Sequence, residues 1–421
     1  MIKRPKEINK IMTKLGNEGY EVYCAGQCVT ASYVGDDPQD WDLYTDCPQE
    51  KILEFFPEGE ALGKRTTRLD YTVEVKAQDI HDVDHLEGIV ADIVTLKGSI
   101  EDQLKIYDLT VEAIAEHPQK SPVDPYGGRE DIKKKLLKAT GDAGKAFQKN
   151  PEKILKVIRY VSLYDFDLSK ELSQTISENA GMLKKADKEE VLYEMLNIIN
   201  GKYAGKALKM LAGLNLLPGI VGEKAAVMNR REAEDYKTLA KNIDQVKQVP
   251  LRRMGLFYLC FDKHYEDAVE YLPYEGLDRE YLLDAKKLVV KICFQNTDAT
   301  LKSFIYKLGW DKYHYIDRLS KAQMKVFDLY KMKTEGRDHI LREILQTKQP
   351  IFVEDLKIDA EDILEAGITD SPERAEFLLS LLPDVVHQNQ KYNDRKTLLK
   401  YAKRFDKSRF RRTFRDVKWL R

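Results

Sequence analysis

The pattern of apolar residues changes near Ser99, and this change limits the possible folds more than any other feature of the sequence. Before it, short alternating segments typical of strands lie between longer segments with helical periodicity. The expected strands are residues 20–25, 41–44, 70–76 and 89–96, and the expected helices are residues 5–18, 27–34 and 49–56. Beyond it, the periodicity is helical almost throughout. The sequence therefore predicts an α+β fold, in which a small mixed or antiparallel sheet with helices is followed by helical segments only.

The length of 421 residues is enough for several domains. We expect a head at residues 1–117, a helical neck at 118–200, a helical body at 201–330 and a helical tail at 331–421. The five cysteines form no C-x-x-C pair, which favours reduced thiols in a cytoplasmic protein. No apolar run reaches the roughly 18 residues of a membrane helix, so we expect neither secretion nor a membrane span.

Asp40 and Asp42 flank Trp41 at the start of one expected strand. Residues i and i+2 of a strand point to the same face, so these two carboxylates can reach one point. Hard oxygen ligands placed this closely suit Mg²⁺, and a pair of such ions is a common catalyst of phosphoryl transfer. A bare D-x-D pattern is weak evidence, because paired surface aspartates are common. The neighbouring motifs therefore decide its interpretation.

The last 35 residues, 387–421, contain 13 Lys or Arg against three Asp, in a chain whose net charge is −1. Aromatic residues are interleaved with these basic residues. Two interpretations are open: a solvated helix that packs by its aromatic side, or a surface that binds the phosphates of an RNA backbone. The candidate RNA-binding residues are Lys403, Arg404, Arg409, Arg411, Arg412 and Arg415.

Three short segments occur in an order and with a spacing that can be compared with known motifs: Gly26-Gln27-Cys28-Val29-Thr30-Ala31, Asp40-Trp41-Asp42 and Asp124-Pro125-Tyr126-Gly127-Gly128. They resemble the Gly-Gly-x-Val-Arg-Asp, D-x-D and DPFGG motifs of the bacterial-type tRNA nucleotidyltransferase (CCA-adding) and poly(A) polymerase family. The resemblance covers residues 10–215. It implies that both aspartates bind Mg²⁺. It also implies that the nucleotide is bound by residues of the first segment, namely Gly26, Gln27, Val29 and Thr30.

Two further segments match the family by their spacing. Glu74-Val75-Lys76-Ala77 is similar to its Glu-Val-Thr-Thr. This implies that Glu74 is a third catalytic acid, which either lies beside the metals or accepts the proton of the attacking hydroxyl. An ordinary glutamate that faces solvent is the alternative. Residues 106–113 resemble Arg-Arg-Asp-Phe-Thr-Ile-Asn-Ala, which implies that Asp108 contacts the ribose. This chain has other residues in place of both arginines of that motif and of the arginine of the first motif. The cations that could supply the missing charge are Lys64, Arg65 and Lys105.

The expected neck helix carries a degraded version of the family's base-selecting motif, Glu-Asp-x-x-Arg with another arginine six residues later. The corresponding residues are Asn150, Lys153 and Arg159. Asn150 still offers one donor group and one acceptor, and Lys153 keeps the charge without the planar fork of an arginine. The resemblance implies that these three side chains face the base or the triphosphate, but it does not carry over the base preference.

The sequence thus predicts a metal-dependent nucleotidyltransferase that adds nucleotides from CTP or ATP to the 3′ end of an RNA, most simply a tRNA. Two alternatives are open. One is a catalytically weak or inactive relative that only binds RNA, which the lost arginines favour and the two retained aspartates oppose. The other is a nucleotidyltransferase with a non-tRNA acceptor. The expected partners are RNA and CTP or ATP, with no membrane, and the expected cofactor is Mg²⁺.

Overall fold

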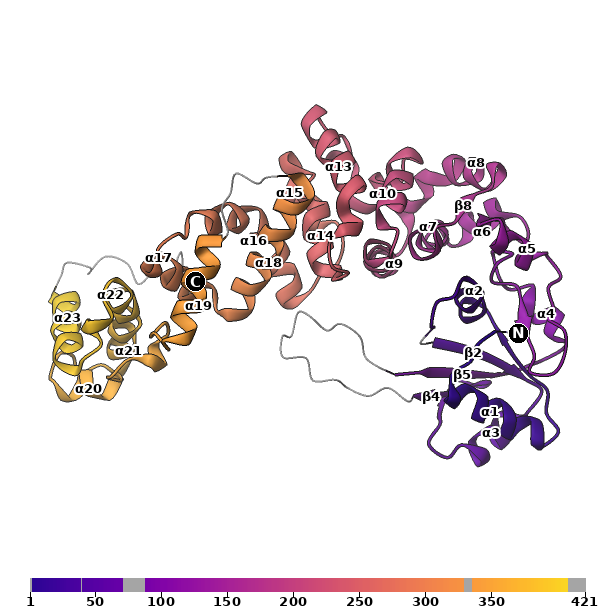
Figure 1. The fold of residues 1–421 in the computed structure, drawn as a ribbon, viewed down its shortest axis with the longest axis horizontal. Helices are drawn as coiled ribbons and strands as arrows, with labels where there is room; N and C mark the ends of the chain where they lie inside the picture. Colours follow the sequence, from indigo (N-terminus) through magenta and orange to yellow (C-terminus); the bar gives the residue numbers. More distant parts are fainter. Residues whose placement is uncertain (1, 39, 71–87, 329–334, 408–421) are drawn as a thin grey trace. The chain divides into compact units, whose positions relative to one another are not determined.

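The computed structural model describes residues 2–38, 40–70, 88–328 and 335–407. By its internal contacts the chain divides into two compact units, Met1–Glu275 and Gly276–Arg421. Figure 1 labels many of the helices and strands of both units. The finer division into head, neck, body and tail stays a prediction.

The first unit begins with a mixed sheet whose strand order is β3-β4-β5-β2-β1-β6. Its strands are β1 (Val22–Ala25), β2 (Asp40–Thr45), β3 (Glu60–Leu62), β4 (Thr66–Asp70), β5 (Val90–Thr95) and β6 (Ala115–Glu116). Strand β2 pairs antiparallel with β1 and parallel with β5, whereas β4 pairs antiparallel with β5. The strand with the two aspartates therefore has a neighbour on each side.

The two faces of this sheet differ because the side chains alternate along each strand. One face carries Cys24 and Leu43, which are fully buried, and α1 (Lys6–Asn17) packs there through Met12, whose sulfur lies 3.5 Å from that of Cys24. The α1 helix forms because its apolar residues recur every three or four positions and all lie on its buried side. The other face carries Asp42, and we call it the carboxylate face.

The helices beside the sheet are α2 (Gln27–Val34), which follows β1 after one glycine, and α3 (Gln49–Phe55), which contacts the edge of the sheet near β4. Helix α4 (Ile100–Leu104) closes one end of the carboxylate face, where Ile100 and Leu104 form a core cluster with Tyr44 and Ala25. The opposite end of that face, at Asp40 and Asp42, is not part of this cluster. The fold thus leaves the two aspartates at an open end.

The rest of the first unit is helical apart from a short parallel pair of strands, β7 (Leu136–Leu137) and β8 (Asp167–Leu168). Helix α5 (Gly128–Lys133) is capped by the Asp124 carboxylate, which accepts hydrogen bonds from the backbone of Gly128 and Arg129 at 2.7 and 3.0 Å. The helices are α5 (Gly128–Lys133), α6 (Ala143–Lys149), α7 (Lys153–Tyr164), α8 (Lys170–Asn179), α9 (Lys188–Asn200), α10 (Ala204–Gly213), α11 (Pro218–Val221), α12 (Glu223–Ala226), α13 (Arg230–Asn242), α14 (Pro250–Tyr258) and α15 (Tyr265–Glu270), with 3₁₀ turns η1 (Ala180–Lys185), η2 (Ile243–Gln245) and η3 (Asp262–His264).

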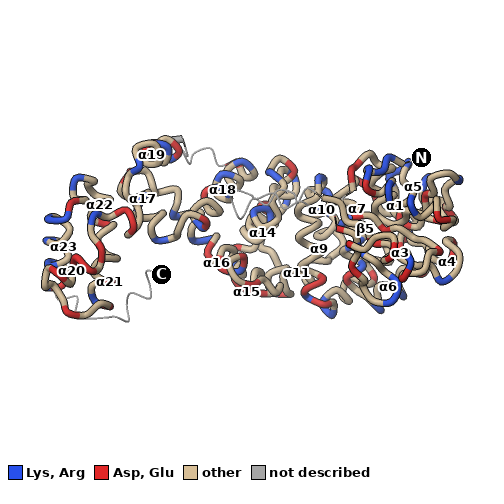
Figure 2. Tube along the Cα trace, turned by 90° about the horizontal axis from the view of Figure 1, so that it is seen from below, with Lys and Arg blue, Asp and Glu red and all other residues tan. Residues whose placement is uncertain are grey.

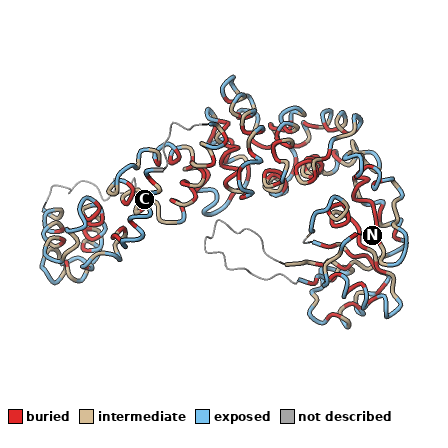
Figure 3. The backbone as a smooth tube through the Cα atoms, in the orientation of Figure 1, coloured by how far each residue is buried: buried red, intermediate tan, exposed pale blue. Residues whose placement is uncertain are grey.

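Every regular element described in the second unit is a helix. One of its core clusters includes Ile363, Leu378, Leu382 and Leu398, each fully buried. Figure 3 shows buried residues along the inner sides of the helices that carry them. Its elements are α16 (Gly276–Lys291), η4 (Ile292–Phe294), α17 (Asp298–Leu308), α18 (Trp310–Phe327), α19 (Glu335–Gln346), η5 (Val353–Asp355), α20 (Ala360–Glu365), α21 (Pro372–Ser380), α22 (Leu382–Gln388), η6 (Gln390–Tyr392) and α23 (Arg395–Lys407).

The predicted fold class is confirmed: a mixed sheet with helices is followed by helical segments. The expected strands at 20–25, 41–44 and 89–96 correspond to β1, β2 and β5, and of the expected strand 70–76 only Asp70 lies within the described residues. The hairpin of β3 and β4 was not predicted. In the described part of the chain, no helix has the length and apolar character needed to cross a membrane.

Candidate active site

The carboxylate face brings three acidic residues together on neighbouring strands. Asp42 is the register partner of Asp92 on β5, and Asp92 is in turn the partner of Arg68 on β4. Directly paired residues of a sheet point to the same face, so these side chains form one row across three strands. Asp40 lies on the same face, two residues before Asp42. The geometry expected of the D-x-D pair is therefore present.

Gly26 connects β1 to α2 directly beside Asp42. Its φ is +85°, and a Cβ atom built there would lie 2.8 Å from the Tyr107 hydroxyl and 3.0 Å from a carboxylate oxygen of Asp42. Both the backbone conformation and the close approach therefore require glycine. The Tyr107 hydroxyl lies 2.8 Å from that of Tyr44. The side chain of Tyr107 thus lies next to Asp42. It is neutral, whereas the family has an arginine at this position.

A cavity of about 550 Å³ opens in front of the two aspartates. Gln27 lines it from the start of α2, and Arg159 lines it from α7. The Arg159 guanidinium donates one hydrogen bond to the Gln27 side chain at 2.6 Å and another to Glu194 at 2.8 Å. The lining residues are Gln27, Cys28, Ala31, Asp36, Pro38, Asp40, Trp41, Asp42, Arg68, Val90, Asp92, Arg159, Leu163, Tyr164, Tyr193 and Asn197.

The electrostatics of this cavity favour a bound cation. The pKa of Asp42 is raised to about 6, mainly by burial and then by the charges of Asp92, Asp40 and Glu112, while the charge of Lys156 opposes this rise. Where several carboxylates oppose one another's ionisation, a bound divalent cation stabilises their ionised forms. Among the described residues no group of three or more His, Cys, Asp or Glu could hold a metal. Mg²⁺ commonly takes one or two carboxylates together with substrate phosphates and waters, and the aspartate pair fits that donor set.

The residues expected to select the base lie at the junction of α6 and α7. Asn150 follows the last residue of α6, and Lys153 is the first residue of α7. The Lys153 ammonium lies 2.9 Å from the Asp108 carboxylate, so these two predicted nucleotide-binding residues form an ion pair. Neither Asn150 nor Lys153 lines the cavity in front of the aspartates.

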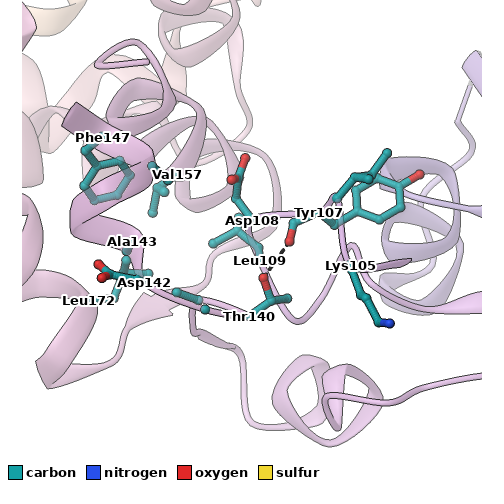
Figure 4. A pocket seen from close by; sticks show the side chains of 14 residues that line it. Lys105, Tyr107, Asp108, Leu109, Thr140, Asp142, Ala143, Phe147, Val157 and Leu172 are labelled. Atoms are coloured by element: carbon teal, nitrogen blue, oxygen red, sulfur yellow. Dashed lines mark hydrogen bonds between the residues drawn. The ribbon is translucent and has the colours of Figure 1, made fainter. Parts of the chain in front are cut away.

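A second, smaller cavity of about 190 Å³ lies beside Asp108 and is lined mainly by residues 105–109 and by residues between 139 and 147. Figure 4 shows Asp108, Phe147 and Val157 around it, and the dashed line marks the hydrogen bond from the Thr140 hydroxyl to the Tyr107 carbonyl oxygen. Lys105 lines this cavity and not the one in front of the aspartates. Its charge is therefore placed away from the D-x-D pair.

Two predicted nucleotide-binding residues face the protein interior. Val29 and Thr30 are fully buried on α2, and the Thr30 hydroxyl donates a hydrogen bond of 2.6 Å to the carbonyl of Val111. This hydrogen bond therefore joins α2 to the segment after Asp108. The family has an arginine at the position of Thr30. The predicted third acid, Glu74, lies outside the described residues.

The structure adds residues that sequence reasoning did not select. Asp92 and Arg68 lie in the row with Asp42, and they are joined by two hydrogen bonds, of 2.8 and 2.7 Å. Glu112, at the asparagine position of the family motif, is buried. Its carboxylate accepts a hydrogen bond of 2.7 Å from the Tyr160 hydroxyl and forms an ion pair with Lys156 at 2.8 Å. The alternation of the 89–96 segment could have placed Asp92 on the face of Asp42.

The predicted RNA-binding residues are described only in part. Lys403 and Arg404 are exposed on α23, and Figure 2 shows basic residues along this helix. The same helix buries Leu398 and Ala402, while Tyr401 and Phe405 pack against the core of the second unit. The other four residues, Arg409, Arg411, Arg412 and Arg415, lie outside the described residues.

Comparison with known proteins gives three findings. A family model described as the probable RNA and SrmB-binding site of polymerase A matches residues 165–226. The chain is similar to the CCA-adding enzyme of Geobacillus stearothermophilus, with 30% identity over 221 residues, which cover 51% of this chain and 55% of that protein. It is also similar to the CCA-adding enzyme of Geobacillus thermodenitrificans, with 29% identity over 237 residues, which cover 55% of this chain and 58% of that protein. The match thus spans little more than half the length of these relatives.

Solved structures extend the likeness to the whole fold. The crystal structure of the Bacillus stearothermophilus CCA-adding enzyme in complex with CTP matches with a TM-score of 0.74 and 20% identity, over 98% of this chain and 100% of that one. The Thermotoga maritima CCA-adding enzyme complexed with tRNA matches with a TM-score of 0.58 and 19% identity, over 95% of each chain. The protein therefore has the fold of the CCA-adding enzymes. The sequence matches to CCA-adding enzymes agree with the resemblance to the tRNA nucleotidyltransferase family.

Proposed function

We propose that this protein is a metal-dependent nucleotidyltransferase that adds nucleotides from CTP or ATP to the 3′ end of an RNA, with tRNA as the acceptor. The observation that carries the proposal is the placement of Asp40 and Asp42 on one face of β2, in front of a cavity of about 550 Å³. The likeness to CCA-adding enzymes supports the same activity.

In the proposed reaction, the 3′ hydroxyl of the RNA attacks the α-phosphate of the nucleotide, and pyrophosphate leaves. Mg²⁺ held by Asp40 and Asp42 would supply Lewis-acid stabilisation of the charge on the phosphates and on the attacking oxygen. Gly26 would let the backbone approach the triphosphate, because no side chain intervenes there. Gln27 and Arg159, joined by a hydrogen bond, would hold part of the wall of the same cavity in place. Glu74 stays a predicted third acid.

The first experiment incubates the purified full chain with Mg²⁺, each labelled nucleoside triphosphate in turn, and tRNA that lacks its 3′ CCA. The matched control is the Asp40→Asn/Asp42→Asn protein, which keeps the shape of both side chains and removes their charge. Stepwise extension by the wild-type protein, lost in the control, is the expected result. An unrelated single-stranded RNA in a parallel reaction tests whether the acceptor is specific.

Two outcomes would favour the alternatives. Extension of the unrelated RNA as fast as of tRNA would indicate a different acceptor. If no nucleotide is added although tRNA binds tightly and in a salt-sensitive manner, the protein is an RNA-binding relative, and the enzyme proposal fails for this substrate. The cytoplasmic location expected from the sequence stays a prediction.

A further inference from the structure

We propose that Arg68, held in place by Asp92, binds the triphosphate of the incoming nucleotide; the inference rests on the proposed function and names the cation that serves it. In the family that the sequence resembles, this charge is expected from arginines that are absent here. Three features of the structure carry this proposal: the position of Arg68 in the row on the carboxylate face, the identity of the cations that line the cavity, and the geometry of the pair between Arg68 and Asp92.

Arg68 reaches the cavity because of the strand register. It pairs with Asp92, and Asp92 pairs with Asp42, so the guanidinium lies on the same face as the aspartates, two strands away from Asp42. Its neighbours along β4, Thr67 and Leu69, are buried on the opposite face. The alternation of β4 therefore fixes the direction of the Arg68 side chain.

Two cations line the cavity among the described residues, Arg68 and Arg159. They face four carboxylates, of Asp36, Asp40, Asp42 and Asp92. The Arg159 side chain is 11% exposed and uses Nε and Nη1 to hold Glu194 and Gln27. The Arg68 side chain is 43% exposed. Arg68 is therefore the cavity cation that a solvated phosphate can reach.

The pair with Asp92 prepares Arg68 for this role. Nε and Nη2 donate to the two carboxylate oxygens of Asp92, which leaves Nη1 outside the pair. A two-point pair of this kind orients the planar guanidinium and reduces the rotational freedom that binding would otherwise remove. A phosphate that meets a preoriented guanidinium gains a charge-assisted hydrogen bond at a lower entropic cost.

The residues at the family's arginine positions do not offer this contact. Thr30 is fully buried and its hydroxyl is bound to the backbone. Tyr107 is neutral, and Ile106 is apolar and 61% exposed. Of the cations suggested by sequence, Lys105 lines the other cavity, and Arg65 donates to the Thr95 carbonyl at 3.5 Å without lining either.

The test measures equilibrium binding of CTP and ATP, and separately of CMP and AMP, to the full chain with Mg²⁺ and without RNA, so that no transfer occurs. The variants are Arg68→Gln and Arg68→Lys, and the matched control is Arg65→Gln on the same hairpin. Because a hydrogen bond to a charged group contributes strongly, Arg68→Gln is expected to weaken triphosphate binding by about tenfold to a hundredfold. Monophosphate binding should change by less than about threefold, and Arg68→Lys should be intermediate.

Asp92 is a positioning residue in this proposal, and a double-mutant cycle tests that role. Asp92→Asn alone should weaken triphosphate binding, whereas in the Arg68→Gln background it should have little further effect. Independent effects of the two substitutions would overturn the link between them. Thermal unfolding of each variant shows whether a loss of affinity reflects a loss of folded protein.

The outcomes separate this inference from the proposed function. If the wild-type protein binds triphosphates and Arg68→Gln binds them equally well, the inference about Arg68 fails and the proposed function stands. The same holds if Arg65→Gln causes the same loss, or if mono- and triphosphates are affected alike. If the wild-type protein binds no nucleoside triphosphate, the proposed function itself fails, and the role of Arg68 with it.

Discussion

The Arg159 guanidinium donates a hydrogen bond of 2.6 Å to the Gln27 side chain and so joins α7 to the turn after β1. Its Nε holds Glu194, whose side chain is 9% exposed. Removing Arg159 would leave a buried carboxylate without its partner, which costs about 3–5 kcal/mol in comparable cases. We therefore expect Arg159→Met to destabilise the first unit by about 3 kcal/mol in urea unfolding of the full chain.

The control for this prediction is the double variant Arg159→Met/Glu194→Leu. It removes both charges and keeps the volume, so most of the lost stability should return. If the double variant is no more stable than Arg159→Met, the cost does not come from the unpaired Glu194 carboxylate.

The raised pKa of Asp42 predicts a pH-dependent stability. The folded protein holds the Asp42 proton up to about pH 6, whereas an unfolded aspartate releases it near pH 4. The contribution of this group to folding is therefore fully present below about pH 4 and is lost as the pH rises through 6. Without metal at pH 7.5, Asp42→Asn should be more stable than wild type by roughly 2–3 kcal/mol at most.

Urea unfolding of both proteins in a chelator at several pH values from 4 to 8 measures this difference. It should shrink toward pH 4. Glu50→Gln, on the exposed side of α3, is the matched control and should show no such trend. A constant difference across the range would contradict a raised pKa.

Protons and metal ions should compete for the same carboxylates. Because Asp42 must ionise to bind a cation, the apparent affinity for Mn²⁺, used as a paramagnetic substitute for Mg²⁺, is expected to fall about tenfold per pH unit below about pH 6. Titration of free Mn²⁺ by electron paramagnetic resonance measures it. An affinity that is unchanged between pH 5 and 7.5 would argue against Asp42 as a ligand.

The altered motif at Asn150 and Lys153 predicts weak base selection. Lys153 is paired with Asp108, and a lysine lacks the fork with which an arginine can read the edge of a base. Restoring the family pattern with Asn150→Asp/Lys153→Arg should raise discrimination of CTP and ATP against UTP and GTP by about tenfold, which corresponds to about 1.4 kcal/mol. The ratio of kcat/KM values for the four nucleotides measures this. Each single substitution serves as its control.

The described part of α23 predicts a contribution to RNA binding. Lys403→Gln/Arg404→Gln removes two exposed charges and should lower the slope of log affinity against log salt by about 1 to 2, because each phosphate contact releases about one counterion. The effect should be the same for tRNAs of different sequence. Lys51→Gln/Lys133→Gln, at exposed positions of the first unit, controls for net charge, and an equal effect there would point to nonspecific attraction.

Much of the fold could be predicted from the sequence, because α1, β2 and β5 carry their periodicity in full. The hairpin of β3 and β4 was missed because its strands are short and β3 is exposed along its whole length. Without β4, the register that places Arg68 beside Asp92 could not be known. Their partnership joins positions 24 residues apart in sequence. A local pattern therefore indicated the aspartates of β2, but only the paired strands show that Arg68 lies in the same row.

The place of β2 between β1 and β5 has a consequence for the lifetime of the site. Asp42 has register partners on both β1 and β5, whereas Asp40 is paired with β5, so moving the backbone of this segment requires breaking strand pairing; Trp41 and Leu43 also anchor the strand in the core. Amides in such a central strand exchange with solvent mainly through the largest openings of a domain. The backbone of the two aspartates therefore keeps its geometry for as long as β2 stays paired in the sheet, and adjustments to successive substrates must come from side-chain rotation and from the parts around the strand.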